Sequence, residues 1–139
     1  VRAVRDPDGA NLDRVQVIKG WVDASGKTHE RIYDVAVSDD RTIGKDGRAR
    51  KPVGSTVDLD KATYSNTIGA PFLSAFWTDP DFNPVDHAFY YVRVLEIPTP
   101  RWTTYDAAFY GIERPSYVPA TTQDRAYTSP IWYTPKSQQ

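Results

Sequence analysis

Residues 97–111, which read IPTPRWTTYDAAFYG, hold the side chains best suited to binding. Four such side chains stand beside the start of an expected helix: Arg101, Trp102, Tyr105 and Asp106. A guanidinium can hold an anion there, because the first amide N–H groups of a helix point toward the same ligand. Two interpretations are open. The segment docks or binds a ligand, or it is an insert that covers an edge of the protein.

Two acidic stretches invite a calcium interpretation, which their spacing does not support. Residues 79–87, DPDFNPVDH, begin like an EF-hand loop. Pro84, however, stands at the sixth position, where glycine is needed, and Tyr90 at the twelfth, where a bidentate glutamate is needed. Turn formation explains residues 6–13, DPDGANLD, because Asp and Asn side chains bond to nearby backbone. We therefore predict turns and no metal site at both stretches.

Motifs that support catalysis are missing from the sequence. The two histidines, His29 and His87, lie in separate turns, and there is no cysteine to complete a zinc site. The basic stretch at residues 41–51 lacks the spacing of a phosphate-binding loop, and no G-x-S-x-G nucleophile motif occurs. We predict that the chain binds no cofactor and is not an enzyme by itself.

The composition argues against several classes of partner. The 139 residues carry a net charge of −1, and the isoelectric point is about 6.1, so no overall positive charge attracts nucleic acid or anionic lipid. No apolar run approaches the roughly 18 residues that a membrane-spanning helix needs. Because the chain begins at Val1 rather than Met, we expect a fragment of a longer protein. We also expect a periplasmic or secreted location, although no residue pattern assigns one.

The elements that position these side chains are mostly β-strands, because apolar residues recur with a period of two. The expected strands cover residues 1–4, 14–22, 30–38, 71–77, 88–97 and 126–133. Strands joined by turns, without alternating helices, predict an all-β fold. We expect an antiparallel, immunoglobulin-like β-sandwich with one short helix in the insert between the last two strands. A single domain should cover residues 1–135, followed by a disordered tail at 136–139.

The strand expected at residues 88–97 is apolar on both faces, which is unusual in a small antiparallel sheet. Alternation places Tyr90, Val92 and Val94 on one face, and Phe89, Tyr91, Leu95 and Ile97 on the other. One face should meet the core of this domain. The other must be covered by the insert at residues 98–124, by a further domain, or by both.

The start of the same strand matches the tyrosine corner of immunoglobulin-like sandwiches. The matching residues are Asp86, Ala88 and Tyr90, at every second position, and the alternative is an ordinary strand start. In a tyrosine corner the hydroxyl bonds to backbone a few residues upstream. We therefore predict that the Tyr90 hydroxyl is buried and bonds to a backbone group.

The insert contains one helix signal. Thr103, with Asp106 three residues later, resembles a capping box, and Gly111 is a suitable end, so we predict a helix over residues 103–110. A helix of about two turns is too short to persist without packing. Phe109 is expected to reach the sheet, while other rings face outward and form an apolar patch for docking or self-association.

Four long stretches resemble the C-terminal end of a large bacterial family that is labelled as a domain of unknown function. They read DPDGANLDRVQVIKGWVD, NTIGAPFLSAFWTDPDFNP, AFYYVRVLEIPTPRWTTYDA and RAYTSPIWYTP. Full-length members resemble metal-dependent hydrolases of the polymerase-and-histidinol-phosphatase type, with His and Asp ligands ahead of this segment. The resemblance implies that the metal-binding part is missing here. It also places Arg101, Trp102, Tyr105 and Asp106 in the family string IPTPRWTxYDA.

The residues and the resemblance together favour an accessory β-sandwich module of a larger metal-dependent hydrolase. It would pack against the catalytic domain of the same chain and lend Arg101 to the rim of the active site. The alternative is a binding module that recognises a carbohydrate or a peptide through exposed Trp and Tyr rings. A row of solvent-facing rings on one sheet would favour that alternative.

Overall fold

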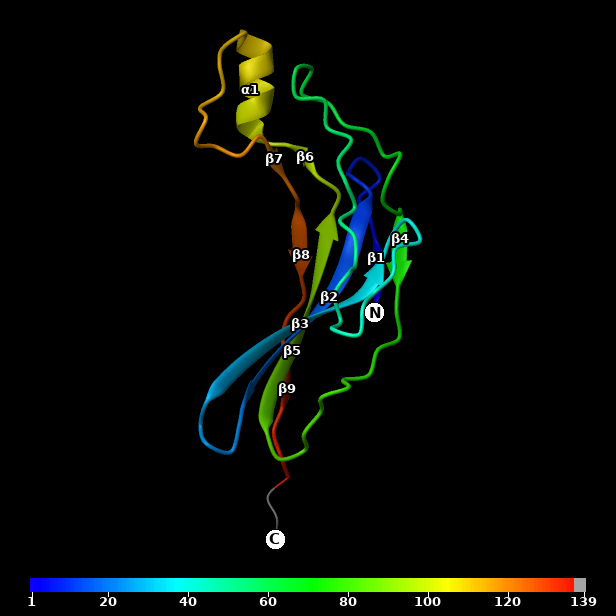
Figure 1. Cartoon of the computed structure of the whole chain (residues 1–139), viewed down its shortest axis with the longest axis vertical. Coiled ribbons are helices and arrows are strands. Elements are labelled where there is room, and N and C mark those ends of the chain that lie inside the picture. The colour runs from blue at the N-terminus through cyan, green and yellow to red at the C-terminus, as the bar shows by residue number, and fades with distance from the viewer. Residues whose placement is uncertain (137–139) are drawn as a thin grey trace.

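The computed structural model describes residues 1–136, which form a long antiparallel sheet with one helix beyond its end (Figure 1). In chain order the elements are β1 (Arg2–Val4), β2 (Leu12–Val22), β3 (Thr28–Val37), β4 (Phe72–Ser74), β5 (His87–Glu96), β6 (Thr99–Pro100), α1 (Trp102–Tyr110), β7 (Thr121–Thr122), β8 (Arg125–Tyr127) and β9 (Ile131–Tyr133). The protein is mostly β, its strands pair antiparallel, and its sheets do not close into a barrel, which confirms the predicted class at this level. The tail expected at 136–139 lies, from residue 137 on, outside the described residues. Among the described residues, no helix has the length and apolar character that crossing a membrane requires.

The main sheet has β2 at its centre. β3 pairs with one edge of β2 and β5 with the other, while β8 and β9 both pair with the free edge of β5. The hairpin expected at 14–22 and 30–38 is confirmed as β2 and β3, and its turn contains Gly26 at a φ of 81°. Two further sheets have two strands each, β1 with β4 and β6 with β7.

The last expected strand, at residues 126–133, is divided into β8 and β9. Pro130 lies between them and has no N–H to donate to a ladder. Thr128 keeps the segment attached to β5: its N–H donates to the Val92 carbonyl at 3.0 Å, and its hydroxyl accepts from the Val92 N–H at 3.0 Å. The strand expected at 71–77 is also shorter, because only residues 72–74, which form β4, pair with β1.

One face of the main sheet meets an apolar core. Leu12, Val15 and Leu73 are buried in it, so the small β1–β4 sheet covers the upper part of this face. The partly buried side chains packed against these three are Ala3, Val35, Ala36, Ala70, Val92 and Val94. Burial of these aliphatic groups provides a major favourable contribution to folding.

Residues 75–86, the strap, cross the lower part of the same face. Buried Lys19 holds the strap, since its Nζ lies 2.6 Å from Asp79 Oδ2 and donates to the Asp81 carbonyl at 2.7 Å. The Tyr90 hydroxyl donates to Asp79 Oδ2 at 2.7 Å. Burial disfavours the charged form of Asp79, but the hydrogen bonds from Lys19 and Tyr90 outweigh it and lower the pKa of this carboxyl.

The hydrogen bond expected for a tyrosine corner is therefore wrong. The Tyr90 hydroxyl pairs with the Asp79 side chain rather than with backbone. A carboxylate accepts a more strongly charge-assisted hydrogen bond than a neutral carbonyl does, and Lys19 already fixes this carboxylate within reach.

A β-bulge buries a carboxylate near the start of β2. The β2–β5 register shifts between Leu12 and Arg14, and Asp13 is 0% exposed. The Asp13 carboxylate accepts hydrogen bonds from Arg14, from Arg41 at 2.6 Å and from Gln123 at 3.0 Å. These bonds join β2 to residues of two distant loops.

A second buried polar pair continues this network along the sheet. Gln16, which is 0% exposed, donates to Asp34 Oδ1 at 2.6 Å and accepts from Arg93 Nε at 2.7 Å. Gln16 and Arg93 lie on the side of the sheet opposite the apolar core, because Val15 and Val17 alternate with Gln16. We call this set the polar network: Asp13, Arg14, Gln16, Asp34, Arg41, Arg93 and Gln123.

The second face of β5 is buried at its upper end and only partly covered at its lower end. Leu95 and Ile97 are buried at the upper end, whereas Phe89 and Tyr91 are only half-buried at the lower end. The insert does not cover those two rings, because α1 lies beyond the opposite end of the sheet (Figure 1). They contact Trp132 and Tyr127 from the neighbouring strands.

The helix is confirmed, but two details of the expectation are wrong. The N-cap is Arg101 and makes no side-chain capping bond, so Thr103 does not form the expected capping box. Phe109 is 83% exposed and does not reach the sheet, because α1 projects away from it (Figure 1). Gly111 ends the helix in the left-handed conformation, as expected.

Replacing Asp13 by alanine should lower the free energy of unfolding by about 3–5 kcal/mol, because the nearly buried guanidinium of Arg41 loses its partner. Chemical denaturation measures the loss. The matched control is Asp8→Ala, an exposed carboxylate near the same end of the sheet, which should change stability by less than about 0.5 kcal/mol. Equally small losses for both variants would contradict a buried polar network.

Candidate binding site at the start of the helix

Two very short strands anchor the start of α1. β6 pairs with β7, and the Ala120 carbonyl next to β7 accepts hydrogen bonds from the Arg101 N–H at 2.9 Å and the Thr104 hydroxyl at 2.7 Å. Thr104 is the only buried residue of the helix. The first turn of α1 is therefore attached to the β6–β7 sheet, while the later turns are exposed to solvent.

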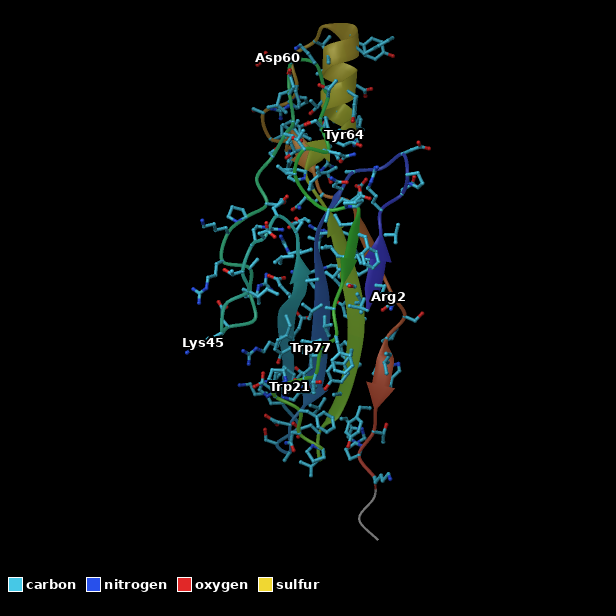
Figure 2. The ribbon with its side chains drawn as sticks, turned by 90° about the vertical axis from the view of Figure 1, so that its right-hand side faces the viewer. Arg2, Trp21, Lys45, Asp60, Tyr64 and Trp77 are labelled. Carbon is cyan, nitrogen blue, oxygen red and sulfur yellow. The ribbon has the colours of Figure 1, made fainter. Side chains whose placement is uncertain are left out.

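An asparagine network brings a second segment to the base of the helix. The Asn11 N–H donates to Asn66 Oδ1 at 2.7 Å. The Asn11 side-chain amide donates to the carbonyls of Asn66 at 3.1 Å and Ile68 at 2.9 Å. These bonds hold the loop that carries Tyr64, which lies near the base of α1 (Figure 2).

The assembled segments enclose a hollow of about 520 Å³, which we call the α1 basin. Its volume lies within the range of small-ligand sites. The lining residues are Gly9, Ala10, Tyr64, Glu96, Thr99, Pro100, Arg101, Trp102, Tyr105, Thr122 and Asp124. They come from four regions of the chain that are far apart in sequence.

Charges of both signs meet in the α1 basin. Burial raises the pKa of the Glu96 carboxyl, and the nearby negative charge of Asp124 raises it further. Burial, with contributions from Tyr64 and Asp124, also raises the pKa of the Tyr105 hydroxyl. The Nε of Arg101 is buried and has no hydrogen-bond partner in the part of the chain that the structure describes. An unpaired buried donor is costly, so an acceptor brought to this place would be favoured.

The side chains that line the basin can hold a ligand through hydrogen bonds and aromatic contacts. Among the described residues, its lining contains no histidine and no cysteine. Within residues 1–136, no three His, Cys, Asp or Glu side chains are placed to hold a metal ion. What the basin offers is one guanidinium donor, two carboxylate acceptors and aromatic walls.

Three of the four predicted site residues meet in this basin, and one does not. Arg101, Trp102 and Tyr105 line it together. Asp106 instead lines a hollow of about 630 Å³ on another side of α1, facing the loop that carries Asp60 (Figure 2). Consecutive helical positions point in different directions, so Asp106 does not line the basin, whereas Tyr105 lines both hollows.

The residues predicted as a structural corner lie at the other end of the sheet. Ala88 is 6% exposed at the start of β5, and Tyr90 holds the strap through Asp79. The Asp86 N–H donates to the Asn83 carbonyl at 3.2 Å in the turn before the strand. These positions contribute to folding and not to the α1 basin.

Three ionisable residues of the basin, Tyr64, Glu96 and Asp124, escaped the sequence-based prediction. Glu96 carried a signal, because it is the only acidic residue in the apolar strand that leads to Pro98. Tyr64 and Asp124 carried none. Their place depends on the Asn11 contacts and on the β6–β7 pair, which join residues far apart in sequence.

A third hollow, of about 550 Å³, lies at the end of the sheet remote from α1. We call it the ring groove. It lies where the β2–β3 hairpin meets the start of β5 and β9 (Figure 1). Its lining residues are Gly20, Trp21, Val22, Thr28, His29, Glu30, His87, Ala88, Phe89, Trp132, Tyr133 and Thr134.

A family model described as "Protein of unknown function (DUF3604)" matches residues 1–135, which is nearly the whole chain. No curated protein matches the chain, and no solved structure does.

Replacing Glu96 by glutamine should raise the melting temperature at pH 7. The raised pKa means that the charged form of Glu96 is less favourable in the folded protein than in the unfolded chain, and glutamine removes that charge. The stability associated with Glu96 is present below its unfolded pKa of about 4.3 and is lost as the pH rises through the folded pKa. The gain should therefore disappear at acidic pH. Calorimetry at several pH values measures it, with exposed Glu113→Gln as the control. A loss of stability at pH 7 would contradict the assigned environment of Glu96.

Proposed function

The chain belongs to the DUF3604 family of proteins of unknown function, and from that membership we propose that it is a non-catalytic accessory module of a larger metal-dependent hydrolase. In this proposal the β-rich chain is an immunoglobulin-like sandwich. It packs against the catalytic domain of the same protein. The surface that packs is the exposed part of α1 together with the rim of the α1 basin. A periplasmic or secreted location belongs to the same proposal.

The observation that carries this proposal is the exposure of apolar rings along α1. Trp102 is 66% exposed, Phe109 83% and Tyr110 68%, and Ile112 just beyond the helix is 60% exposed. The rings of Phe109 and Tyr110 contact each other, with centroids 5.0 Å apart, and exposed apolar surface that is contiguous usually marks a contact site. A nine-residue helix is also marginal in water without tertiary packing, and only Thr104 is buried.

Arg101 gives the proposed interface a polar anchor. Its Nε has no partner among the described residues, although the atom is buried. An arginine in this state prefers a carboxylate or a phosphate, which can accept two of its N–H groups. A catalytic domain seated on α1 would bring such an acceptor within reach, at the rim of its own active site. In the chain by itself, the same surface would favour contact with a second copy.

A second candidate function is favoured by one specific observation. Four aromatic rings form a row on the second face of the lower sheet: Trp132, Phe89, Tyr91 and Tyr127. Trp132 is 72% exposed and Tyr127 56%. Such a row supports a module that binds a carbohydrate or a peptide through its rings. Since this surface lies at the opposite end from α1, the two functions are compatible.

Removing a ring from α1 tests the docking proposal. Phe109→Ser should leave the melting temperature of the isolated chain unchanged, because the ring is 83% exposed. The same substitution in a full-length family member should lower its melting temperature by several degrees. The control is Phe76→Ser, since Phe76 is 98% exposed and lies outside α1.

Arg101→Ala should likewise leave the melting temperature of the isolated chain unchanged and reduce ester hydrolysis by the full-length protein. If either variant unfolds the isolated chain and spares the full-length protein, the docking role is wrong.

The purified chain should be catalytically inert. We expect that it neither retains a divalent metal after dialysis nor hydrolyses chromogenic phosphate or sulfate esters. The expectation follows from the sequence, which lacks cysteine and a nucleophile motif, and from residues 1–136, in which no three His, Cys, Asp or Glu side chains are placed to hold a metal ion. Elemental analysis and a colorimetric assay are the measurements. Metal at one ion per chain, with turnover that a chelator abolishes, would contradict it.

A further inference from the structure

The ring groove has the size and the lining of a small-ligand site. Its volume of about 550 Å³ lies within the range of about 300–1,000 Å³ that such sites occupy. Its walls combine the rings of Phe89 and Trp132 with a few polar side chains. Trp21 lies at the end of the sheet away from Asp60 and Tyr64 (Figure 2). The groove is thus separate from the α1 basin.

A glycine shapes the floor of the groove. Gly20 of β2 lies directly opposite Phe89 of β5 in the register. A Cβ at Gly20 would lie 2.3 Å from the Phe89 Cζ atom, so the phenyl ring occupies the space that any other residue would fill. The ring therefore leans across β2 instead of standing upright on β5, and it offers a broad apolar surface.

The other rings extend this surface. Tyr91 lies 6.4 Å from Phe89, and the two ring planes differ by only 10°. Trp132 lies 5.4 Å from Phe89 on the outer side. Tyr127 continues the row, 6.2 Å from Tyr91. An extended ligand could contact several of these rings at once.

Polar side chains stand on the same face as the Phe89 ring. The register places Glu30 opposite Gly20, and His87 opposite Val22 in the next row. Glu30 and His87 are exposed, and neither makes a side-chain hydrogen bond or an ion pair with a residue that the structure describes. They are therefore available to a ligand as an acceptor and as a group that can donate or accept.

The charges of the lining argue against an anionic ligand. No lysine or arginine lines the groove, and Glu30 contributes a negative charge. An exposed aromatic ring with hydrogen-bonding groups at its margin matches a neutral sugar, whose C–H face can lie on the ring while its hydroxyls point sideways. The electron-rich ring face attracts such C–H groups.

We propose that the ring groove binds a neutral oligosaccharide, with one sugar ring stacked on Phe89 and flanked by Trp132, whose plane is tilted by 52° from that of Phe89, and with Glu30 and His87 bonded to its hydroxyls. The proposal deepens the second candidate function and rests on it. It does not depend on docking through α1, because α1 contributes no residue to the groove. The parallel Tyr91 ring offers a place for a further sugar unit.

Affinity electrophoresis tests the proposal. The 139-residue chain is run through native gels that contain xylan, hydroxyethylcellulose, galactomannan or mixed-linkage β-glucan, and through gels that contain alginate as an anionic polymer. We expect retardation by at least one neutral polysaccharide and none by alginate. No retardation by any neutral polymer, or stronger retardation by alginate, would overturn the proposal. Binding of an unstructured peptide library with no binding of polysaccharide would overturn it as well.

Matched variants locate the site. Trp132→Ala should weaken the binding roughly tenfold or more, a loss of about 1.4 kcal/mol, because it removes one stacking ring. Its ring is 72% exposed, so the fold should persist, as circular dichroism can verify. Glu30→Gln should also weaken binding, while Tyr117→Ala, which removes an 86% exposed ring outside the groove, should not. Equal effects of Trp132→Ala and Tyr117→Ala would contradict a site in this groove. Loss of α1 docking in a full-length protein would leave these results unchanged, so the two proposals fail separately.

Discussion

The burial of the Asp13 carboxylate is the constraint on which the arrangement of this chain depends. A buried charge must be paired, and the bulge in β2 places this one where Arg14, Arg41 and Gln123 can reach it. The Gln123 amide also donates to the Glu96 carbonyl at 2.8 Å, which ties the segment after β7 to the end of β5. That segment positions the Ala120 carbonyl, on which the base of α1 rests. The orientation of the helix thus follows from a pairing requirement in the sheet.

The same requirement divides the second face of the sheet into two parts. Near Asp13 the face is occupied by the polar network, and aromatic rings replace it farther along β5. This division explains why β5 is apolar on both sides of its lower half. One side meets the strap, and the other offers the rings of the groove. The exposed rings of α1 lie beyond the upper end of the sheet, so the two proposed contact surfaces are separated by the length of the main sheet (Figure 1).

Patterns within short stretches of sequence predict the hairpin and the end of the helix. Features that depend on pairing between distant segments have no such pattern and were not predicted. The alternation in β2 and β3 predicted their hairpin, and Gly111 predicted the end of α1, because both signals act within a few residues. The bulge at Asp13 has no such signal, since it is set by partners on other segments. The sequence predicts a backbone partner for the Tyr90 hydroxyl, because the spacing of residues does not show that Lys19 lies beside Asp79. The rings of β5 were visible in the sequence, but their row with Trp132 and Tyr127 depends on how β8 and β9 pair with β5.

We propose that α1 packs against a further domain while the ring groove stays open to ligand. Hydrogen exchange, followed by mass spectrometry on the isolated chain and on a full-length family member, tests it most directly. We expect strong protection of residues 101–112 to appear only in the full-length protein, while residues 28–30 and 131–133 exchange equally in both. The opposite pattern, with an unprotected helix and a groove that becomes protected, would contradict both assignments at once.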